Sequence, residues 1–368
     1  MLCQSGSSIL IPHRLSENLY VSEFVAAYER LGWDVRSGSD QFWNDCPDVS
    51  ILHVHWPEAL YRWASRKPVD QAAQETIARF IALRSVGVKI VWTVHNLAPH
   101  EYMDDPVDQG VYSALAQLAD VIAHHCPYSV EALHKRYGAP AHAIEVIIPH
   151  GHYFGYPRGI GRTKARKRLS LAEDEVVFLS FGIIRAYKGL NFILEAFDKT
   201  PVKRKRLLIA GRFQPAHRRK SVAERWFLTR LRYMTPRVSL HLGVVPIADV
   251  QVFLDASDVV VLGHSRGLNS GLVPLGMTFG KVVVGPDIGC IAWTLRQGAN
   301  LVYTPGDVNA FASAMAAAVQ KSTVPARELN VEVARSWDWD LGAKTILEAV
   351  RAQMPGIGKR DDRCSRSL

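Results

Sequence analysis

The sequence predicts an α/β protein with two successive parallel sheets, and three observations lead to that prediction. Short runs of β-branched and aliphatic residues alternate with helix-length amphipathic segments through nearly all of the 368 residues. The runs in the second half are continuously apolar, which is typical of strands buried on both faces of a parallel sheet. The chain is also longer than the size at which one hydrophobic core stops growing, so we expect two domains.

The expected strands fall into two series. In the first half they are residues 8–12, 51–56, 89–95, 120–125 and 145–149. In the second half they are residues 175–182, 206–211, 238–243, 259–263, 281–285 and 300–303. Two of the helices between them, over residues 16–32 and 69–87, end in glycine, as helix C-termini commonly do.

The stretch between the two series, residues 151–170, is rich in glycine and basic residues and poor in periodic hydrophobic residues. That composition is typical of an interdomain linker. We therefore expect an N-terminal domain over residues 1–155 and a C-terminal domain over residues 165–335. The polar tail over residues 355–368 is expected to be disordered.

Basic charge is concentrated in one part of the chain. The net charge is +9, and residues 203–232 contain eleven Lys and Arg against one Glu. Such a surface suits nucleic acid, an anionic membrane or a phosphorylated substrate. Residues 217–233 read as an amphipathic helix, which either faces its own domain or contacts a membrane. No nucleic-acid motif accompanies the charge, so nucleic acid is not an expected partner.

The chain shows no sign of membrane insertion or of a disulfide framework. No apolar run approaches the ~20 residues that a membrane span needs, and the first residues lack the pattern of a signal peptide. The five cysteines are scattered and form no C-x-x-C motif. We therefore expect reduced thiols in a cytoplasmic protein.

Two patterns resemble metal sites and are interpreted otherwise. His53 and His55 lie on one face of an expected strand, but no third histidine or cysteine stands at ligand spacing, so we expect no metal. Asp338 and Asp340 have the D-x-D spacing of metal-dependent transferases. They stand where the last helix begins, which favours helix capping.

One loop of the second half has the design of an anion site. The strand over 259–262 runs into a polar loop with Asn269, Ser270 and Gly271, and a short apolar helix follows. Turns of this kind in parallel α/β sheets present backbone N–H groups to anions. Arg185 and Lys188 follow the first strand of the same half. Two cations and a helix N-terminus can stabilise a diphosphate leaving group without a metal ion.

Taken in order, these stretches resemble the GT-B glycosyltransferases, in the broad group of family-4-like nucleotide-sugar enzymes. The resemblance implies two Rossmann-like domains that face each other across a cleft, with the acceptor on the N-terminal domain and the donor on the C-terminal one. It also implies that residues 336–354 form a helix that crosses back. The donor-binding residues that it implies are Gly182, Arg185, Lys188, Gly211, Asn269, Ser270 and Gly271.

The chain departs from the retaining members of that group. They carry two glutamates in this loop region, and the positions here hold Leu268 and Gly276. Residues 53–58, 91–101 and 269–289 are more similar to a bacterial exopolysaccharide branch of xanthan-type β-mannosyltransferases. That resemblance implies inversion, with GDP-mannose as the favoured donor and no other cofactor. It implies a glycan or a polyprenyl-diphosphate-linked oligosaccharide as the acceptor.

Inversion requires a general base on the N-terminal domain, because the acceptor hydroxyl loses its proton as it attacks. Glu101 is the first candidate, since burial at the cleft wall would raise the pKa of its carboxyl group. His95 is the second, although a histidine at a strand end can equally be a packing residue. His13 is the third, because some inverting GT-B enzymes place a histidine there. His55, Glu58 and His100 are expected to line the acceptor site.

Two other functions fit the same resemblance. A nucleotide-sugar epimerase shares the two-domain design and needs no acceptor. A catalytically inactive GT-B binding protein would account for the missing glutamates. For the transferase, a place on the inner face of the cytoplasmic membrane is favoured, because residues 60–67 combine aromatic and basic side chains.

Overall fold

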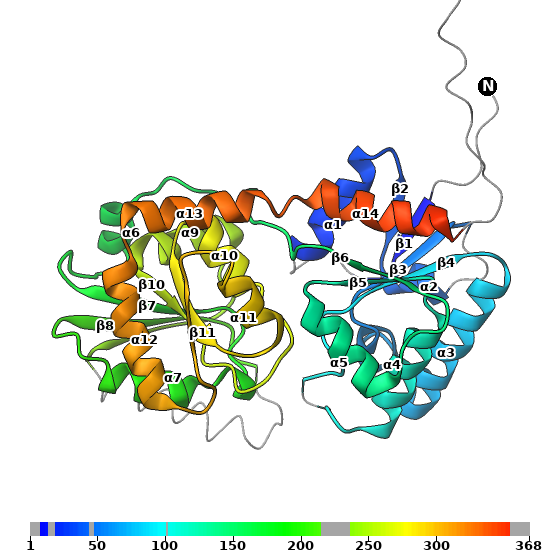
Figure 1. Ribbon diagram of the computed structural model, residues 1–368, viewed down its shortest axis with the longest axis horizontal. Helices are drawn as coiled ribbons and strands as arrows, with labels where there is room; N and C mark the ends of the chain where they lie inside the picture. The colour runs from blue at the N-terminus through cyan, green and yellow to red at the C-terminus, as the bar shows by residue number, and fades with distance from the viewer. Residues whose placement is uncertain (1–7, 14–18, 44–47, 101, 215–235, 354–368) are drawn as a thin grey trace, which may run out of the picture.

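The apolar runs of the chain form two six-stranded parallel sheets, one in each of two α/β domains (Figure 1). The computed structural model describes residues 8–13, 19–43, 48–100, 102–214 and 236–353. The predicted α/β class with two parallel sheets is confirmed. The amphipathic helix expected over 217–233 and the tail over 355–368 lie outside the described residues.

The sheet of the N-terminal domain has the strand order β2-β1-β3-β4-β5-β6. Its strands are β1 (Ser8–Ile11), β2 (Asp34–Ser37), β3 (Ile51–Val54), β4 (Lys89–Thr93), β5 (Val121–His124) and β6 (Ile144–Ile147). Its helical elements are α1 (Leu19–Arg30), α2 (Ser39–Trp43), the π-helical turn η1 (Ala59–Trp63), α3 (Val69–Ser85), α4 (Pro106–Leu118) and α5 (Pro127–Tyr137). Every residue of β3 is buried, as expected for a strand covered by helices on both faces.

The sheet of the C-terminal domain has the order β12-β11-β10-β7-β8-β9. Its strands are β7 (Val176–Phe181), β8 (Lys205–Gly211), β9 (Val238–Leu242), β10 (Val259–Val261), β11 (Val282–Pro286) and β12 (Leu301–Tyr303). Its helical elements are α6 (Arg162–Arg168), the 3₁₀ turn η2 (Ala186–Lys188), α7 (Leu190–Lys199), α9 (Ile247–Ala256), α10 (Leu272–Thr278), α11 (Gly289–Leu295), α12 (Val308–Lys321) and α13 (Val324–Arg335). The strand order reverses between β7 and β10, and ligands of open α/β sheets bind at such a point.

The last helix, α14 (Trp339–Ala352), returns to the N-terminal domain and packs on α1 (Figure 1). The carboxylate of Asp338 accepts a hydrogen bond from the N–H of Leu341 at 2.8 Å, so the predicted capping role is confirmed. Asp340 pairs with Arg30 of α1. In the D-x-D pattern, Asp338 therefore caps the start of α14 and Asp340 attaches the helix to α1.

The chain passes between the domains twice, and the two passages are bonded to each other. The N–H of His152 donates to the carbonyl of Trp337 at 3.2 Å. The indole N–H of Trp339 donates to the carbonyl of His152 at 2.8 Å. Both passages therefore run through one place on the domain boundary, along the upper edge of the view in Figure 1.

The domains are closed against each other. Leu268 and Cys290, which belong to the C-terminal domain, are buried in a hydrophobic cluster of the N-terminal domain. Cys290 forms a disulfide with Cys126. The expectation of reduced thiols is therefore wrong for this pair. The two cysteines are 164 positions apart and only domain packing brings them together, so no spacing rule predicts the bond.

None of the helices in the described ranges is both long and apolar enough to cross a membrane.

Candidate functional site

The first strand of the C-terminal domain ends in a glycine turn that places two cations at the domain boundary. Gly182 and Gly211 both have positive φ, and a Cβ on Gly211 would overlap the carbonyl oxygen of Gly182. Glycine is therefore needed there for the close approach of two strand ends. The chain then forms η2, and Arg185 and Lys188 stand at either end of this turn.

Lys188 is a partly buried cation of the turn. Burial, and after it the charge of Arg185, lower the pKa of its ammonium group to about 8. No carboxylate of the described residues forms an ion pair with Lys188. One Nη of Arg185 donates to the amide oxygen of Gln214 at 3.0 Å. The turn therefore offers an electrostatic site that an anion would complete.

The N-terminal domain adds a residue to this site. The ring of His100 stacks on Tyr187 of η2, with centroids 4.1 Å apart. Its pKa is lowered to about 4 by burial and then by the charges of Arg185, Lys188 and Arg266. Although His100 was expected to line the acceptor site, the structure places it among the predicted donor-binding cations.

His264 is a further member that the sequence interpretation did not single out. It lies shortly after the end of β10, is 5% exposed, and has no hydrogen-bond partner for Nδ1 among the described residues. Burial holds its pKa well below the usual value, and the charge of Lys188 adds to that effect. The sequence could have indicated His264 as a site residue, because it is the first residue of the polar loop that also contains Asn269. Its proximity to Lys188 depends on the pairing of β7 with β10.

The polar loop itself is fastened to the N-terminal domain. Asn269 donates from its side-chain amide to the carbonyls of Val94 and His95, at 3.4 and 3.3 Å. A guanidinium N–H of Arg266 donates to the carbonyl of His100 at 2.8 Å. Asn269, predicted to bind the donor, thus holds the loop against the end of β4.

The end of that loop meets the chain passage between the domains. A Cβ on Gly271 would lie 2.8 Å from the hydroxyl of Tyr153 and 3.4 Å from the ring of His150. Ser270 lies next to it and is partly buried. The helix that follows, α10, has only seven residues, so its dipole is weaker than that of a long helix.

Histidines gather at the carboxyl ends of the strands in the N-terminal domain. They are His13 after β1, His53 on β3, His55 after β3, His95 after β4, His125 after β5 and His150 after β6. Burial lowers the pKa of each of these imidazoles. They are therefore neutral at pH 7, and a neutral imidazole can accept a proton.

Two of the three base candidates can be compared. Nε2 of His13 accepts the N–H of His55 at 3.0 Å, so its lone pair is already engaged. Nε2 of His95 shares a hydrogen bond with Nδ1 of His55 at 3.2 Å, and its ring stacks on Trp56 at 4.3 Å. The remaining candidate, Glu101, lies outside the described residues.

The acceptor candidates are distributed differently. His55 lies inside the histidine group, where it contacts His95 and His13. Glu58 is buried, and its carboxylate accepts a hydrogen bond from the hydroxyl of Tyr112 on α4 at 2.6 Å. The structure thus engages this carboxylate inside the N-terminal domain. The described residues contain no group of three His, Cys, Asp or Glu side chains that could hold a metal ion.

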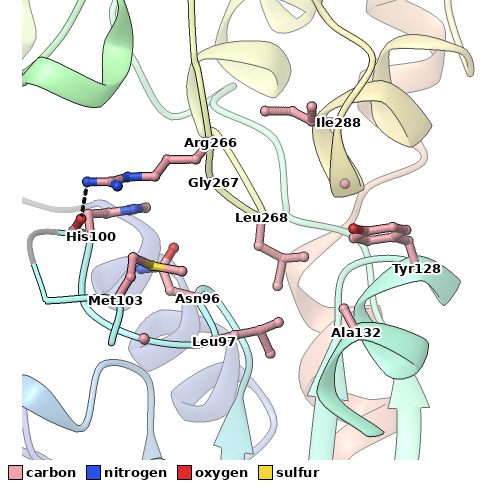
Figure 2. Close-up of a pocket in the computed structure, with 12 residues that line it drawn as sticks. Asn96, Leu97, His100, Met103, Tyr128, Ala132, Arg266, Gly267, Leu268 and Ile288 are labelled. Atoms are coloured by element: carbon pink, nitrogen blue, oxygen red, sulfur yellow. Dashed lines mark hydrogen bonds between the residues drawn. The ribbon is translucent and has the colours of Figure 1, made fainter. Parts of the chain in front are cut away.

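A pocket of about 290 Å³ lies between the domains (Figure 2). Figure 2 shows Arg266 and His100 together at one end, with Tyr128 and Ala132 at the other. The lining residues are Asn96, Leu97, Ala98, His100, Met103, Tyr128, Ala132, Arg266, Gly267, Leu268, Ile288 and Gly289. The pocket therefore runs from the cationic site into a mostly apolar space between α5 and α11.

Part of the chain matches a known sequence family. Residues 175–321 match the family described as Glycosyl transferases group 1. The chain is 28% identical over 243 residues to the GDP-mannose:glycolipid 4-beta-D-mannosyltransferase of Xanthomonas campestris pv. campestris, over 64% of this chain and 61% of the relative. It is 23% identical over 299 residues to the D-inositol 3-phosphate glycosyltransferase of Streptomyces scabiei, over 75% and 65%. The match thus spans about three fifths of the first relative's length.

Solved structures share the architecture. The sucrose-phosphate synthase of Thermosynechococcus elongatus has a TM-score of 0.71 at 17% identity and covers 95% of this chain and 99% of its own. Anabaena Alr3699/HepE in complex with UDP-glucose has a TM-score of 0.69 at 15% identity, with 94% and 99% covered. The fold is therefore the two-domain GT-B arrangement.

Proposed function

We propose that this chain, whose residues 175–321 match the family described as Glycosyl transferases group 1, is a glycosyltransferase that moves a hexose from a nucleoside diphosphate sugar to a carbohydrate acceptor. One observation carries the proposal. Arg185 and Lys188 stand at the ends of the turn whose Tyr187 stacks on His100, and Arg266 donates a hydrogen bond to the carbonyl of His100, so three cations converge where the domains meet.

The chemistry of transfer explains why such a site is useful. When the bond between the anomeric carbon and the phosphate oxygen breaks, negative charge grows on the leaving diphosphate. Lys188 and Arg185 would stabilise that charge from a partly buried position, where electrostatic interactions are stronger than in water. Because both cations are in place before the substrate binds, they do not have to move during the reaction.

The acceptor would be deprotonated from the opposite domain. We assign the general base to His95. Its ring stands at the end of β4, and its carbonyl accepts a hydrogen bond from Asn269 of the polar loop over residues 264–271, which we call the donor loop. The bond to His55 would orient the imidazole as it gains the proton. Leu268 and Gly276 replace the two glutamates of retaining relatives, which supports inversion.

The donor and acceptor are proposed from similarity. The Xanthomonas relative is named for GDP-mannose and a glycolipid, so we propose GDP-mannose as the donor and a polyprenyl-diphosphate-linked oligosaccharide as the acceptor, in exopolysaccharide synthesis. A place on the inner face of the cytoplasmic membrane suits such an acceptor. Trp63, which is 60% exposed beside the exposed Arg66 and Lys67, supports contact with an anionic surface.

The test is a donor panel with matched variants. Thermal shift and nucleotide release are measured with GDP-, UDP- and dTDP-sugars for the wild type, Arg185→Ala and Lys188→Ala. Arg204→Ala and Lys344→Ala, which change exposed cations elsewhere, are the controls. One nucleotide should stabilise the wild type and both controls but neither site variant.

The same panel separates the alternatives. Slow release of the matching nucleoside diphosphate identifies a transferase, since water can replace the acceptor. Conversion of the sugar without release identifies an epimerase. Stabilisation by a donor without any turnover identifies a binding protein. If no nucleotide stabilises the wild type, the proposal is wrong.

A further inference from the structure

We propose that the disulfide between Cys126 and Cys290 is a reversible redox lock that holds the two domains closed and stops turnover. Cys126 stands immediately before α5 of the N-terminal domain, and Cys290 lies in α11 of the C-terminal domain. Their Cα atoms are 5.6 Å apart. The consequence for turnover rests on the proposed function, whereas the mechanical consequence does not.

The bond adds a third covalent connection between the domains. The two passages of the main chain are bonded to each other through His152, Trp337 and Trp339, so they act as one hinge. A single hinge leaves the domains free to rotate about it. The disulfide joins α5 to α11, which are different elements from the hinge. With both connections in place, that rotation is blocked.

Each cysteine of the disulfide is connected to residues of the candidate site. The N–H of Cys290 donates to the carbonyl of Leu268 at 2.9 Å, one residue before Asn269. Cys126 follows His125, whose ring lies 5.3 Å from that of His95. The disulfide therefore fixes the distance between the donor loop and the end of the strand that carries the proposed base.

Substrate exchange requires this distance to change. In the closed structure the donor loop is bonded to the N-terminal domain through Arg266 and Asn269. The pocket of about 290 Å³ beside it is just below the range of volumes typical of ligand sites. A nucleoside diphosphate sugar must reach Lys188 from between the domains. Entry and product release therefore need the domains to separate.

The chemistry of the switch is thiol–disulfide exchange. Oxidation converts the two thiols and one low-molecular-weight disulfide into the Cys126–Cys290 bond and two small thiols, through a mixed disulfide. Reduction by a dithiol runs the same exchange in reverse. Disulfides of cytosolic proteins are usually transient, catalytic or redox-sensing. Both sulfurs are buried, so exchange proceeds through local opening near the cleft.

The experiment compares oxidised and reduced wild-type protein. Oxidised glutathione and dithiothreitol set the two states, and mass spectrometry after thiol labelling verifies the pair. We expect reduction to raise nucleotide release from the matching donor at least tenfold. It should also speed hydrogen exchange in residues 264–271 and raise the radius of gyration in scattering.

Variants supply the controls. Cys290→Ser should behave like the reduced wild type under both conditions, and Cys364→Ser should keep the response to oxidation. If Cys290→Ser does not fold, the two wild-type states still decide the question. Equal turnover and equal exchange in verified oxidised and reduced protein would overturn the lock, as would failure of the pair to oxidise. Redox-dependent exchange without turnover in either state would leave the lock standing and contradict the proposed function.

Discussion

The ring of His100 lies parallel to the ring of Tyr187, with 18° between their planes, although the two residues belong to different domains. Tyr187 is the middle residue of η2, between Arg185 and Lys188. The stack therefore sets the position of the two cations relative to the N-terminal domain.

Donor binding should weaken as pH rises, because Lys188 loses its proton and with it its positive charge. The pKa of Lys188 is about 8 without a ligand, and an anion raises it. The dissociation constant of the matching nucleoside diphosphate should therefore increase above pH 8, by up to about tenfold per pH unit. Isothermal titration at pH 7, 8 and 9 measures this. Lys188→Arg should bind with little change over the same range, and a flat wild-type profile would contradict the assignment.

His95→Ala should reduce kcat by about 10²- to 10⁴-fold with a smaller change in KM, since general-base catalysis contributes about that factor. His55→Ala should lower kcat less, because the base remains but loses its partner at 3.2 Å. Steady-state kinetics with a sugar acceptor measure both. Burial holds the pKa of His95 well below 6.5, so the wild-type kcat should stay level as pH falls through 6.5. Near-normal kcat in His95→Ala would transfer the role to another residue.

Asn269→Ala should loosen the closed state. It removes two interdomain hydrogen bonds of 3.3 and 3.4 Å, and one such bond is worth about 1 kcal/mol. We expect kcat/KM to fall about fivefold and hydrogen exchange at Val94 and His95 to speed up. Asn309→Ala, on the exposed start of α12, is the matched control. Unchanged exchange in Asn269→Ala would show that this contact does not hold the loop.

Acid should destabilise the fold through the buried histidines of the N-terminal domain. The pKa is about 3 for His13, His53 and His150 and about 4 for His125, against 6.5 in the unfolded chain. Because these folded-state values are lowered, the unfolded chain binds more protons below pH 6.5. Stability is therefore fully present above pH 6.5 and is lost as pH falls toward 4.

The number of buried histidines sets how steeply the free energy of unfolding falls as pH is lowered. Each contributes at most about 1.4 kcal/mol per pH unit to the free energy of unfolding. Urea unfolding at pH 7.5, 6.5 and 5.5 should show a midpoint that falls slightly between the first two and more steeply between the second and the third. His53→Gln should reduce the fall. A midpoint that stays constant down to pH 5.5 would contradict burial of these rings.

The sequence predicts the strands whose burial dictates their composition. β10 and β11 are buried throughout, so they had to be continuously apolar. β2 was missed because it is an edge strand that pairs only with β1 and its residues, Asp34–Ser37, are half-exposed. Nothing in their composition distinguishes them from a loop.

The site residues also divide into those that the sequence predicts and those that it does not. Arg185 and Lys188 were predictable because they directly follow a strand end, where parallel sheets place ligands. The place of His100 beside them, and the contact of Asn269 with β4, arise from how the domains close. Those contacts join segments about 85 to 175 positions apart. Local periodicity carries no information on them.

The return of α14 to the N-terminal domain has a consequence for synthesis on the ribosome. Trp339, Ile346 and Val350 fill a hydrophobic cluster with Ile9 and Phe24, near the start of the chain. The N-terminal domain is therefore translated first but lacks one wall of its core until residue 352 has left the exit tunnel. The C-terminal domain has all of its own strands by then. It can complete its core first, and the earlier-made half of the molecule finishes last.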